Sequence, residues 1–290
     1  MNKVEIPEIL EAFRNYDGTY KRKHVDAAIE LKDEIIPHLI DVLEKLVSDP
    51  TSYIENDESF DHIYAVVLLS HFGDPRAHQV LVDVLNMPGE VCEQIWDDYI
   101  DEFIGALLTT CGGSMDKIKS VIVNKDADDV CRTHAAHAMI FAVVDGMTLR
   151  EEALDFFGSL FTGTEADEDS NFWGFLAGNL YDLYPEELMP VIEKAYQDEL
   201  IEPFIISLED FEEAMRRGRD YVYERAQREM EAWMPTNVHD YMSHWACFTS
   251  ERRFPVSPVI PFLTQVEKKK RNKKKKKKKM AKASRRKNRR

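Results

Sequence analysis

The amino-acid sequence predicts an all-α fold in which pairs of helices stack side by side, followed by a disordered basic tail. Three observations lead to this prediction. Apolar residues recur at the spacing of one helix face through most of residues 1–250. Signals that start and stop helices fall between these apolar stripes. One apolar segment also returns later in the chain with almost the same residues.

The apolar stripes place the helices along the chain. The first clear stripe comprises Leu39, Val42, Leu43 and Leu46, and similar spacing recurs towards residue 247. Connections are short, which favours antiparallel neighbours. In order, helices are predicted at residues 7–16, 21–31, 34–47, 59–72, 75–87, 91–110, 115–123, 127–145, 149–161, 170–183, 185–199, 208–217, 219–233 and 237–247.

Capping residues support several of these boundaries. Asp74-Pro75 places an N-cap acceptor before a proline at the first helical position. Thr148 with Glu151, and Ser207 with Asp210, have the spacing of a capping box. These signals predict that new helices begin near residues 75, 149 and 208.

An internal repeat indicates how the helices stack. Leu39–Leu43 reappears as Leu81–Leu85 forty-two residues later, within the period of about 40–47 residues typical of HEAT and armadillo arrays. We therefore expect an all-α, HEAT-like superhelix rather than an irregular bundle, because each pair must stack to cover its apolar stripe. The expected pairs are residues 21–47, 59–87, 91–123, 127–161 and 170–199. Residues 7–16 and 208–247 are expected to cap the two ends.

Four short motifs connect the chain to a known family: Phe72–Arg76, Asp182–Leu188, Pro203–Asp210 and Trp245–Phe248. With them, the stretch from about residue 35 to 248 resembles a bacterial domain family of unknown function with HEAT-like repeats. Members often end in a cysteine-rich zinc motif, but no cysteine follows Cys247 here. The resemblance therefore implies the fold, and it implies neither catalytic residues nor that zinc motif.

Charge divides the chain into an acidic body and a basic tail. The net charge of −15 combines −31 on residues 1–266 with +16 on residues 267–290. We predict a helical domain at 1–250, an extended apolar, proline-containing strap at 251–266 and a disordered tail at 267–290. The acidic body disfavours nucleic acid, whose binding depends on lysine and arginine.

The tail is predicted to attach electrostatically, without sequence specificity, to RNA, DNA or the ribosome. Folding back onto the acidic body, binding an anionic membrane and a merely solubilising role are the alternatives. No aromatic residue interleaves the tail to stack on bases. The candidate residues of this tether are Lys273, Lys274, Lys275, Lys276, Lys277, Lys278, Lys279, Arg285 and Arg286.

An acidic segment near the middle of the chain is a candidate partner surface. Trp96, Ile100 and Phe103 have the spacing of a buried helix face. The intervening acids are then expected to point outwards, as a solvated face or a ridge for a basic protein. An acid/base pair or a site for a hard cation is the less favoured interpretation. These acids are Asp97, Asp98, Asp101 and Glu102.

Cys131, His134 and His137 are a weak candidate metal site. Their spacing of three residues places them on one broad helix face, where a thiolate and imidazoles could bind zinc. A fourth ligand is missing, and the metalloprotease pattern of two histidines with a glutamate is absent. Packing or surface roles are therefore favoured, and no cofactor is predicted.

The sequence as a whole favours a soluble, cytoplasmic protein that is not an enzyme. Its first twenty residues are charged throughout, its longest apolar run has seven residues, and its four cysteines form no CxxC pair. We expect an interaction scaffold with a basic protein partner and the tail as tether. The alternatives are an RNA- or ribosome-associated factor in which the tail is the main functional element and, third, a metal-dependent enzyme. The sequence names no partner, and it leaves the oligomeric state open.

Overall fold

The computed structural model describes residues 4–56, 59–167, 170–234 and 236–248. The chain divides into two units, residues 1–250 and 251–290. The second unit, which contains the predicted strap and the predicted tail, lies outside the described residues. Within the described ranges every regular element is a helix, as predicted. None of the described helices is both long and apolar enough to cross a lipid bilayer.

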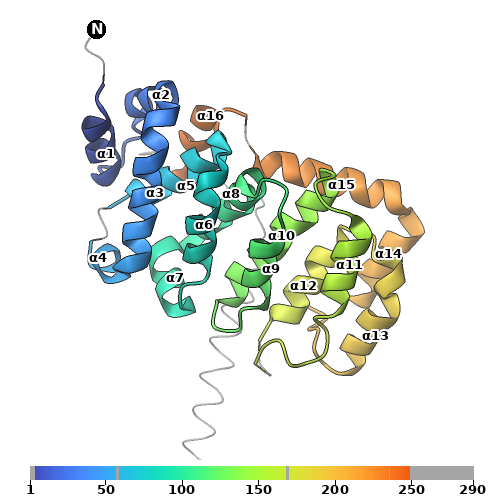
Figure 1. Ribbon diagram of the computed structural model, residues 1–290. Coiled ribbons are helices and arrows are strands. Elements are labelled where there is room, and N and C mark those ends of the chain that lie inside the picture. Colours follow the sequence, from blue (N-terminus) through green and yellow to red (C-terminus); the bar gives the residue numbers. More distant parts are fainter. Residues whose placement is uncertain (1–3, 57–58, 168–169, 235, 249–290) are drawn as a thin grey trace, which may run out of the picture. The chain divides into compact units, whose positions relative to one another are not determined.

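The helices follow one another with short connections (Figure 1). The first are α1 (Ile6–Arg14), α2 (Arg22–Glu30), α3 (Lys32–Ser48), α4 (Pro50–Ile54), α5 (Asp61–Phe72), α6 (His78–Leu85) and α7 (Gly89–Trp96). The next are α8 (Phe103–Thr110), α9 (Asp116–Val123), α10 (Asp129–Val144), α11 (Arg150–Gly158), α12 (Phe172–Tyr181) and α13 (Met189–Gln197). The last are α14 (Leu208–Arg217), α15 (Arg219–Trp233) and α16 (Val238–Met242). Short 3-10 helices are η1 (Pro75–Ala77), η2 (Asp97–Glu102), η3 (Glu186–Leu188) and η4 (Ala246–Phe248).

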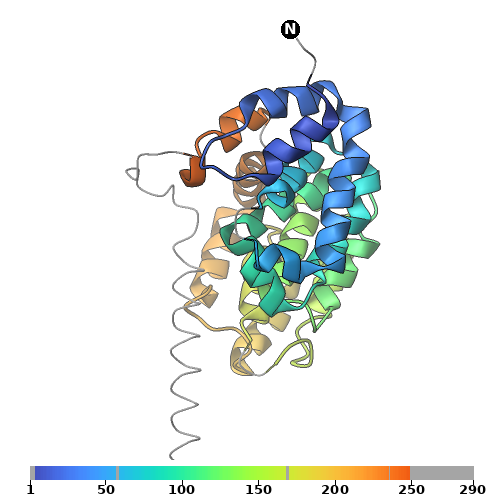
Figure 2. The ribbon, with the colours of Figure 1, turned by 90° about the vertical axis from the view of Figure 1, so that its left-hand side faces the viewer.

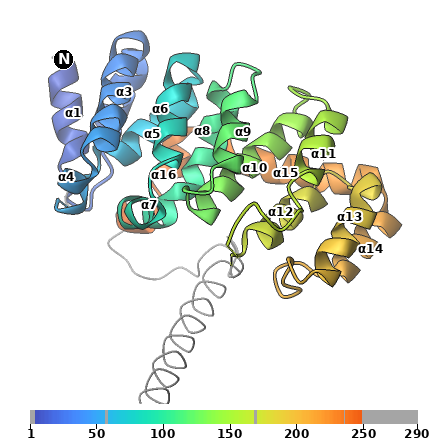
Figure 3. The ribbon, with the colours of Figure 1, turned by 60° about the horizontal axis from the view of Figure 1, so that its bottom comes forward.

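Two rows of helices form the centre of the helical unit (Figure 3). In the first row α5 packs on α8, α8 on α10 and α10 on α12. In the second row α3 packs on α6 and α6 on α9, while α5, α8 and α10 also contact these helices. Helix α5 is apolar on nearly every face because it lies between α3 and α8. Burial between neighbours therefore stabilises the first row along its whole length.

Some predicted caps are present and others are not. Asp74 accepts a hydrogen bond from the Arg76 backbone, and Ser207 and Asp210 form the predicted capping box. At α11 the N-cap is Leu149, without a side-chain cap, so the capping box predicted there was wrong. The short helix α4 was also missed, since its five residues are too few to show a periodicity.

The helix predicted at residues 91–110 is broken into α7, η2 and α8. A 3-10 helix turns every 3.0 residues rather than every 3.6, so η2 rotates the side chains that follow it relative to a continuous α-helix. Trp96 still lies in the core, with its ring 4.9 Å from that of Phe103. The acidic residues at the end of η2 take directions that the α-helical pattern did not predict.

The C-terminal helices return along the first row, so the prediction that residues 208–247 cap only the far end was wrong. Helix α15 packs against α10 and α8, and α16 packs against α5 (Figure 1). Gly105 in α8 permits this approach, because a Cβ there would lie 2.6 Å from the Trp233 backbone oxygen.

The returning segment reaches the N-terminal helices (Figure 2). The Tyr16 hydroxyl donates a hydrogen bond of 2.6 Å to the Cys247 carbonyl oxygen. His239 Nδ1 lies 2.9 Å from the Tyr20 hydroxyl, and His239 Nε2 lies 2.8 Å from Asp26 Oδ1. The last described helices therefore form a third layer over the first row.

Candidate functional site

A layer of polar side chains, the polar layer, lies among the buried apolar residues between the returning helices α15 and α16 and the first row. Most inter-helix contacts in the row are made by apolar side chains, whereas this layer contains carboxylates, imidazoles and a guanidinium. Such groups are seldom buried without partners, because desolvation of a charge is unfavourable. Their positions therefore mark the part of the described structure where chemistry or ligand binding is most plausible.

The first pair in this layer joins η2 to α10. His134 is buried, and its Nε2 lies 2.6 Å from Asp101 Oδ1. The contact spans thirty-three residues of sequence. It positions the imidazole of His134 between two neighbouring elements.

The second pair joins η2 to α16. The Tyr241 hydroxyl donates a hydrogen bond of 2.7 Å to Glu102 Oε1. Burial raises the pKa of Glu102 to about 8, and it also raises the pKa of Tyr241. Burial therefore favours the protonated form of Glu102 in this layer.

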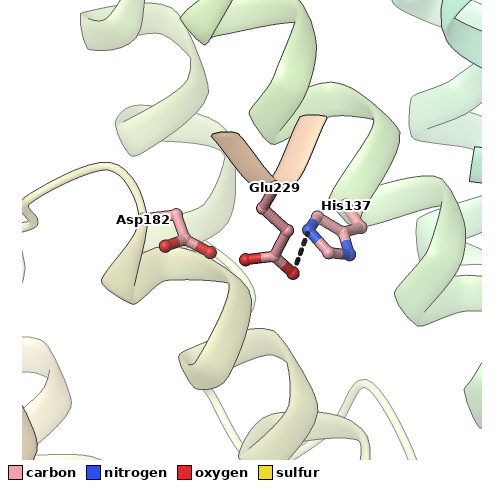
Figure 4. A group of neighbouring side chains, drawn as sticks. All are labelled: His137, Asp182 and Glu229. Carbon is pink, nitrogen blue, oxygen red and sulfur yellow. Dashed lines mark ion pairs between the residues drawn. The ribbon is translucent and has the colours of Figure 1, made fainter. Parts of the chain in front are cut away.

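The third group brings together His137 of α10, Asp182 at the end of α12 and Glu229 of α15 (Figure 4). One ligand atom from each residue lies within 4.8 Å of the others. His137 Nε2 is 3.6 Å from Glu229 Oε1. Arg225 of α15 donates a hydrogen bond to Asp182, and its guanidinium carbon lies 4.5 Å from the centre of the Tyr181 ring.

Burial favours the neutral form of each titratable member of this group. It raises the pKa of Asp182 to about 7, despite the opposing effect of Arg225. Burial also raises the pKa of Glu229 and lowers that of His137 to about 3. A proton or another cation bound to the carboxylates would relieve this unfavourable burial.

The predicted metal trio is not brought together. Cys131 Sγ lies 3.2 Å from Cys92 Sγ, while His134 contacts Asp101 and His137 contacts Glu229. The reason is helical geometry, since the six residues from Cys131 to His137 rotate the side chain by about 120° around the helix. Contact with Cys92, followed by burial, raises the pKa of the Cys131 thiol. This disfavours the thiolate form that zinc would require.

The outward direction predicted for Asp101 and Glu102 is corrected. Both side chains are partly buried, and they contact His134 and Tyr241. The turn of η2 is responsible for this inward direction. Asp97 and Asp98 belong to η2, but their side chains lie outside the described structure.

The tether residues Lys273–Lys279, Arg285 and Arg286 lie outside the described residues as well. The aromatic residues Phe172, Trp173 and Phe175 of α12 are buried.

Sequence reasoning missed Asp182, Arg225 and Glu229 as site residues. A signal was available in α15, where Val222, Ala226 and Met230 are buried on one face. Arg225 and Glu229 lie beside this apolar stripe and four residues apart, so the helix carries charges next to its buried face. Charged residues at such positions are a sequence pattern of buried ion pairs or ligand sites.

These features define an all-helical protein with stacked helices, a returning C-terminal layer and a polar layer between the two. A family model described as "Protein of unknown function (DUF1186)" matches residues 4–249, and the chain belongs to that family.

Two relatives have also been compared with the chain. An uncharacterized protein of Chlamydia trachomatis serovar D is 27% identical over 209 residues, covering 72% of this chain and 83% of the relative. An uncharacterized protein of Chlamydia muridarum is 27% identical over 209 residues, covering 72% of this chain and 84% of the relative. No solved structure matches the chain significantly.

Proposed function

We propose that this protein is a non-enzymatic interaction scaffold, built as a HEAT-like superhelix, whose acidic body binds a basic protein partner. The successive packing of α5, α8, α10 and α12 supports the repeat interpretation. Among the described residues of the polar layer, Asp101, Glu102 and Asp182 contact His134, Tyr241 and Arg225 between packed elements. This arrangement supports binding and assembly rather than turnover of a substrate.

The charge separation along the chain carries this proposal. The −31 charge on residues 1–266 creates a field that attracts basic partners and speeds their association. Because Asp101 and Glu102 point inwards, we place the partner surface on α13 and α14 and the segments beside them. Residues 185–214 contain ten acids and one lysine. The exposed acids there are Glu186, Glu187, Glu193, Asp198, Glu199, Glu209, Asp210 and Glu212.

Charge neutralisation on two separate faces tests the partner surface. The test variant combines Glu193→Gln, Glu209→Gln and Glu212→Gln, and the matched control combines Asp33→Asn, Asp41→Asn and Glu44→Gln on α3. Each full-length variant is used as bait in an extract of the source cells. A basic protein should be retained by the wild type and the control and lost from the test variant. Equal capture by both variants, or no specific capture by the wild type, contradicts the proposal.

The tail is proposed to add electrostatic attachment to nucleic acid. Displacement of counterions by lysines makes such binding steeply dependent on salt. Replacing all seventeen lysines and arginines of residues 267–290 with glutamine should abolish retention of the full chain on RNA at low salt, and it should leave thermal unfolding of the body unchanged. Retention that survives the replacement contradicts the tether.

The seven consecutive lysines also favour the second candidate, an RNA- or ribosome-associated factor in which the tail is the main functional element. Ribosome sedimentation distinguishes the two candidates. If the tail is the main functional element, the glutamine tail variant leaves the ribosomal fractions, whereas the α13–α14 variant remains there. A chain that stays with ribosomes only when its acidic surface is intact favours the scaffold.

A further inference from the structure

The group formed by His137, Asp182 and Glu229 contains two carboxylates and one neighbouring guanidinium. Arg225 donates its hydrogen bond to Asp182, so with both carboxylates ionised only one of them is paired with a positive charge. The second negative charge would then lie in a largely buried layer without a cation. Buried charges are normally paired or bound to a metal ion.

The three ligand atoms have the spread that a metal ion requires. Bonds from zinc to histidine nitrogen and carboxylate oxygen are about 2.0–2.2 Å long, so two ligands of a tetrahedral ion lie about 3.4 Å apart. His137 Nε2 and Glu229 Oε1 are 3.6 Å apart, and all three ligand atoms lie within 4.8 Å of one another. Side-chain movements of about an ångström would complete the geometry.

His137 provides an observation that is independent of the acids. Its Nε2 atom is buried and has no hydrogen-bond partner, although the side chain points towards Glu229 (Figure 4). An unpaired buried nitrogen is unfavourable unless something else binds its lone pair. A neutral imidazole nitrogen is also a common metal ligand.

The surroundings of Asp182 and Glu229 leave carboxylate oxygens available to a bound ion. Asp182 accepts a hydrogen bond from Arg225 with one oxygen, which leaves its other oxygen for a metal, and ligating carboxylates are commonly held in this way. The Glu229 side chain is 32% exposed, so this member of the group is accessible to solvent.

We propose that His137, Asp182 and Glu229 bind a divalent metal ion, with zinc as the best match to one nitrogen and two oxygen ligands. Calcium and magnesium prefer sites made entirely of oxygen, and copper(I) prefers sulfur. The ion links α10, the end of α12 and α15. It therefore fastens the returning C-terminal layer to the first row, a role separate from the partner surface on α13 and α14.

Zinc affinity of the full-length protein tests this site. The protein is stripped with a chelator, and zinc is titrated at pH 7.5 in competition with a coloured chelator. We expect one tight site per chain. Each of His137→Gln, Asp182→Asn and Glu229→Gln should weaken it at least about tenfold, because replacing even an outer partner of a ligand commonly weakens binding by 10–100-fold.

Two matched variants serve as controls. His134→Gln changes the neighbouring histidine of the same helix, and Cys131→Ser changes the buried thiol pair, so both should leave zinc affinity unchanged. Far-UV circular dichroism of each variant establishes that it is folded. Zinc should also raise the thermal unfolding temperature of the wild type and of these two controls, because a ligand that binds only the folded state stabilises it.

Cobalt(II) substitution gives a second readout. Ligation by nitrogen and oxygen produces only weak visible bands, whereas thiolate ligation adds an intense near-ultraviolet band. Absence of tight zinc binding by the wild type overturns the proposal. It is equally overturned if the three ligand variants bind zinc like the wild type, or if the thiolate band identifies Cys92 and Cys131 as the ligands.

Discussion

The interface within the first row and the interface between this row and the returning helices use different chemistry. Between α5 and α8 the contacts are made almost wholly by buried apolar side chains. Between the row and α15–α16, buried apolar side chains are accompanied by polar contacts of Glu102 with Tyr241, His137 with Glu229 and Asp182 with Arg225. Apolar burial depends little on pH, whereas the polar contacts include carboxyl groups with raised pKa values. We therefore expect a change of pH to loosen the returning layer while the row stays folded.

The largest expected loss of stability comes from removing a buried apolar side chain from the first row. Leu69 in α5 is fully buried, and Leu69→Ala should lower the free energy of unfolding by about 2–5 kcal/mol through lost burial and a cavity. Urea denaturation measures this change. Val123→Ala, at an exposed position, should change stability by no more than about 0.5 kcal/mol. Similar values for both variants would contradict the assignment of Leu69 to the central core.

The close approach of α15 to α8 gives the second test. Gly105→Ala would place a Cβ 2.6 Å from the Trp233 backbone oxygen, and such overpacking lowers stability by about 1–3 kcal/mol. The matched control is Gly178→Ala in α12, where nothing lies within 4 Å of the added atom. This control should gain about 0.5–1 kcal/mol from helix propensity. If Gly105→Ala proves as stabilising as Gly178→Ala in urea denaturation, α15 does not lie against α8.

The pH dependence of stability distinguishes the polar layer from the first row. Burial raises the folded-state pKa of Asp182 to about 7 and that of Glu102 to about 8, and it also raises that of Glu229. The folded protein then binds more protons than the unfolded chain from about pH 4 up to these values, so their contribution to stability falls as pH rises. Asp101, His134, Arg225 and Tyr241 also face this layer.

His137 acts in the opposite direction at lower pH. Its pKa is lowered to about 3, so the unfolded chain binds the extra proton between about pH 3 and 6.5, and acidification below pH 6.5 destabilises the fold. From pH 6.5 to 8 the loss of protons from the carboxylates outweighs the remaining, opposite contribution of His137, and stability should fall by about 1–2 kcal/mol. Urea denaturation of metal-free protein at several pH values measures this slope. Glu102→Gln should flatten it, and an unchanged slope in that variant would contradict the assignment.

The smallest expected effect comes from the Tyr241 hydroxyl. Tyr241→Phe removes the hydrogen bond to Glu102 and should lower stability by about 0.5–1.5 kcal/mol. Because this hydrogen bond lowers the pKa of Glu102, its loss should also move the pH-dependent fall in stability to higher pH. Tyr221→Phe is the control, since that hydroxyl makes its contact with Arg217 on the surface. A loss of equal size in both variants would argue against a buried Glu102–Tyr241 pair.

Local patterns predicted the helices of the two rows well and the polar layer poorly. The stripes of α3, α5 and α6 and the capping box at Ser207 depend on residues close in sequence, and periodicity detects such arrangements. The contact between Glu102 and Tyr241 joins residues 139 positions apart. Nothing in the local sequence specifies that α15 turns back rather than extending the row.

The acids of η2 show the same limit at short range. One α-helix extrapolated through residues 91–110 places Asp101 and Glu102 outside, whereas the 3-10 turn directs them to His134 and Tyr241. In η2, the packing of Trp96 and of the returning helices determines the side-chain directions, and the 3.6-residue period of an α-helix does not. Residues that form a site by such packing cannot be grouped from spacing alone.

Hydrogen exchange resolved by peptide tests the difference between the two interfaces most directly. Metal-free full-length protein is compared at pH 6.5 and pH 8, after correction for the intrinsic effect of pH on exchange. We predict that protection in α15 and α16 falls at the higher pH, while protection in α5 and α8 stays the same. Equal changes in all four helices, or no change in α15 and α16, would contradict the account.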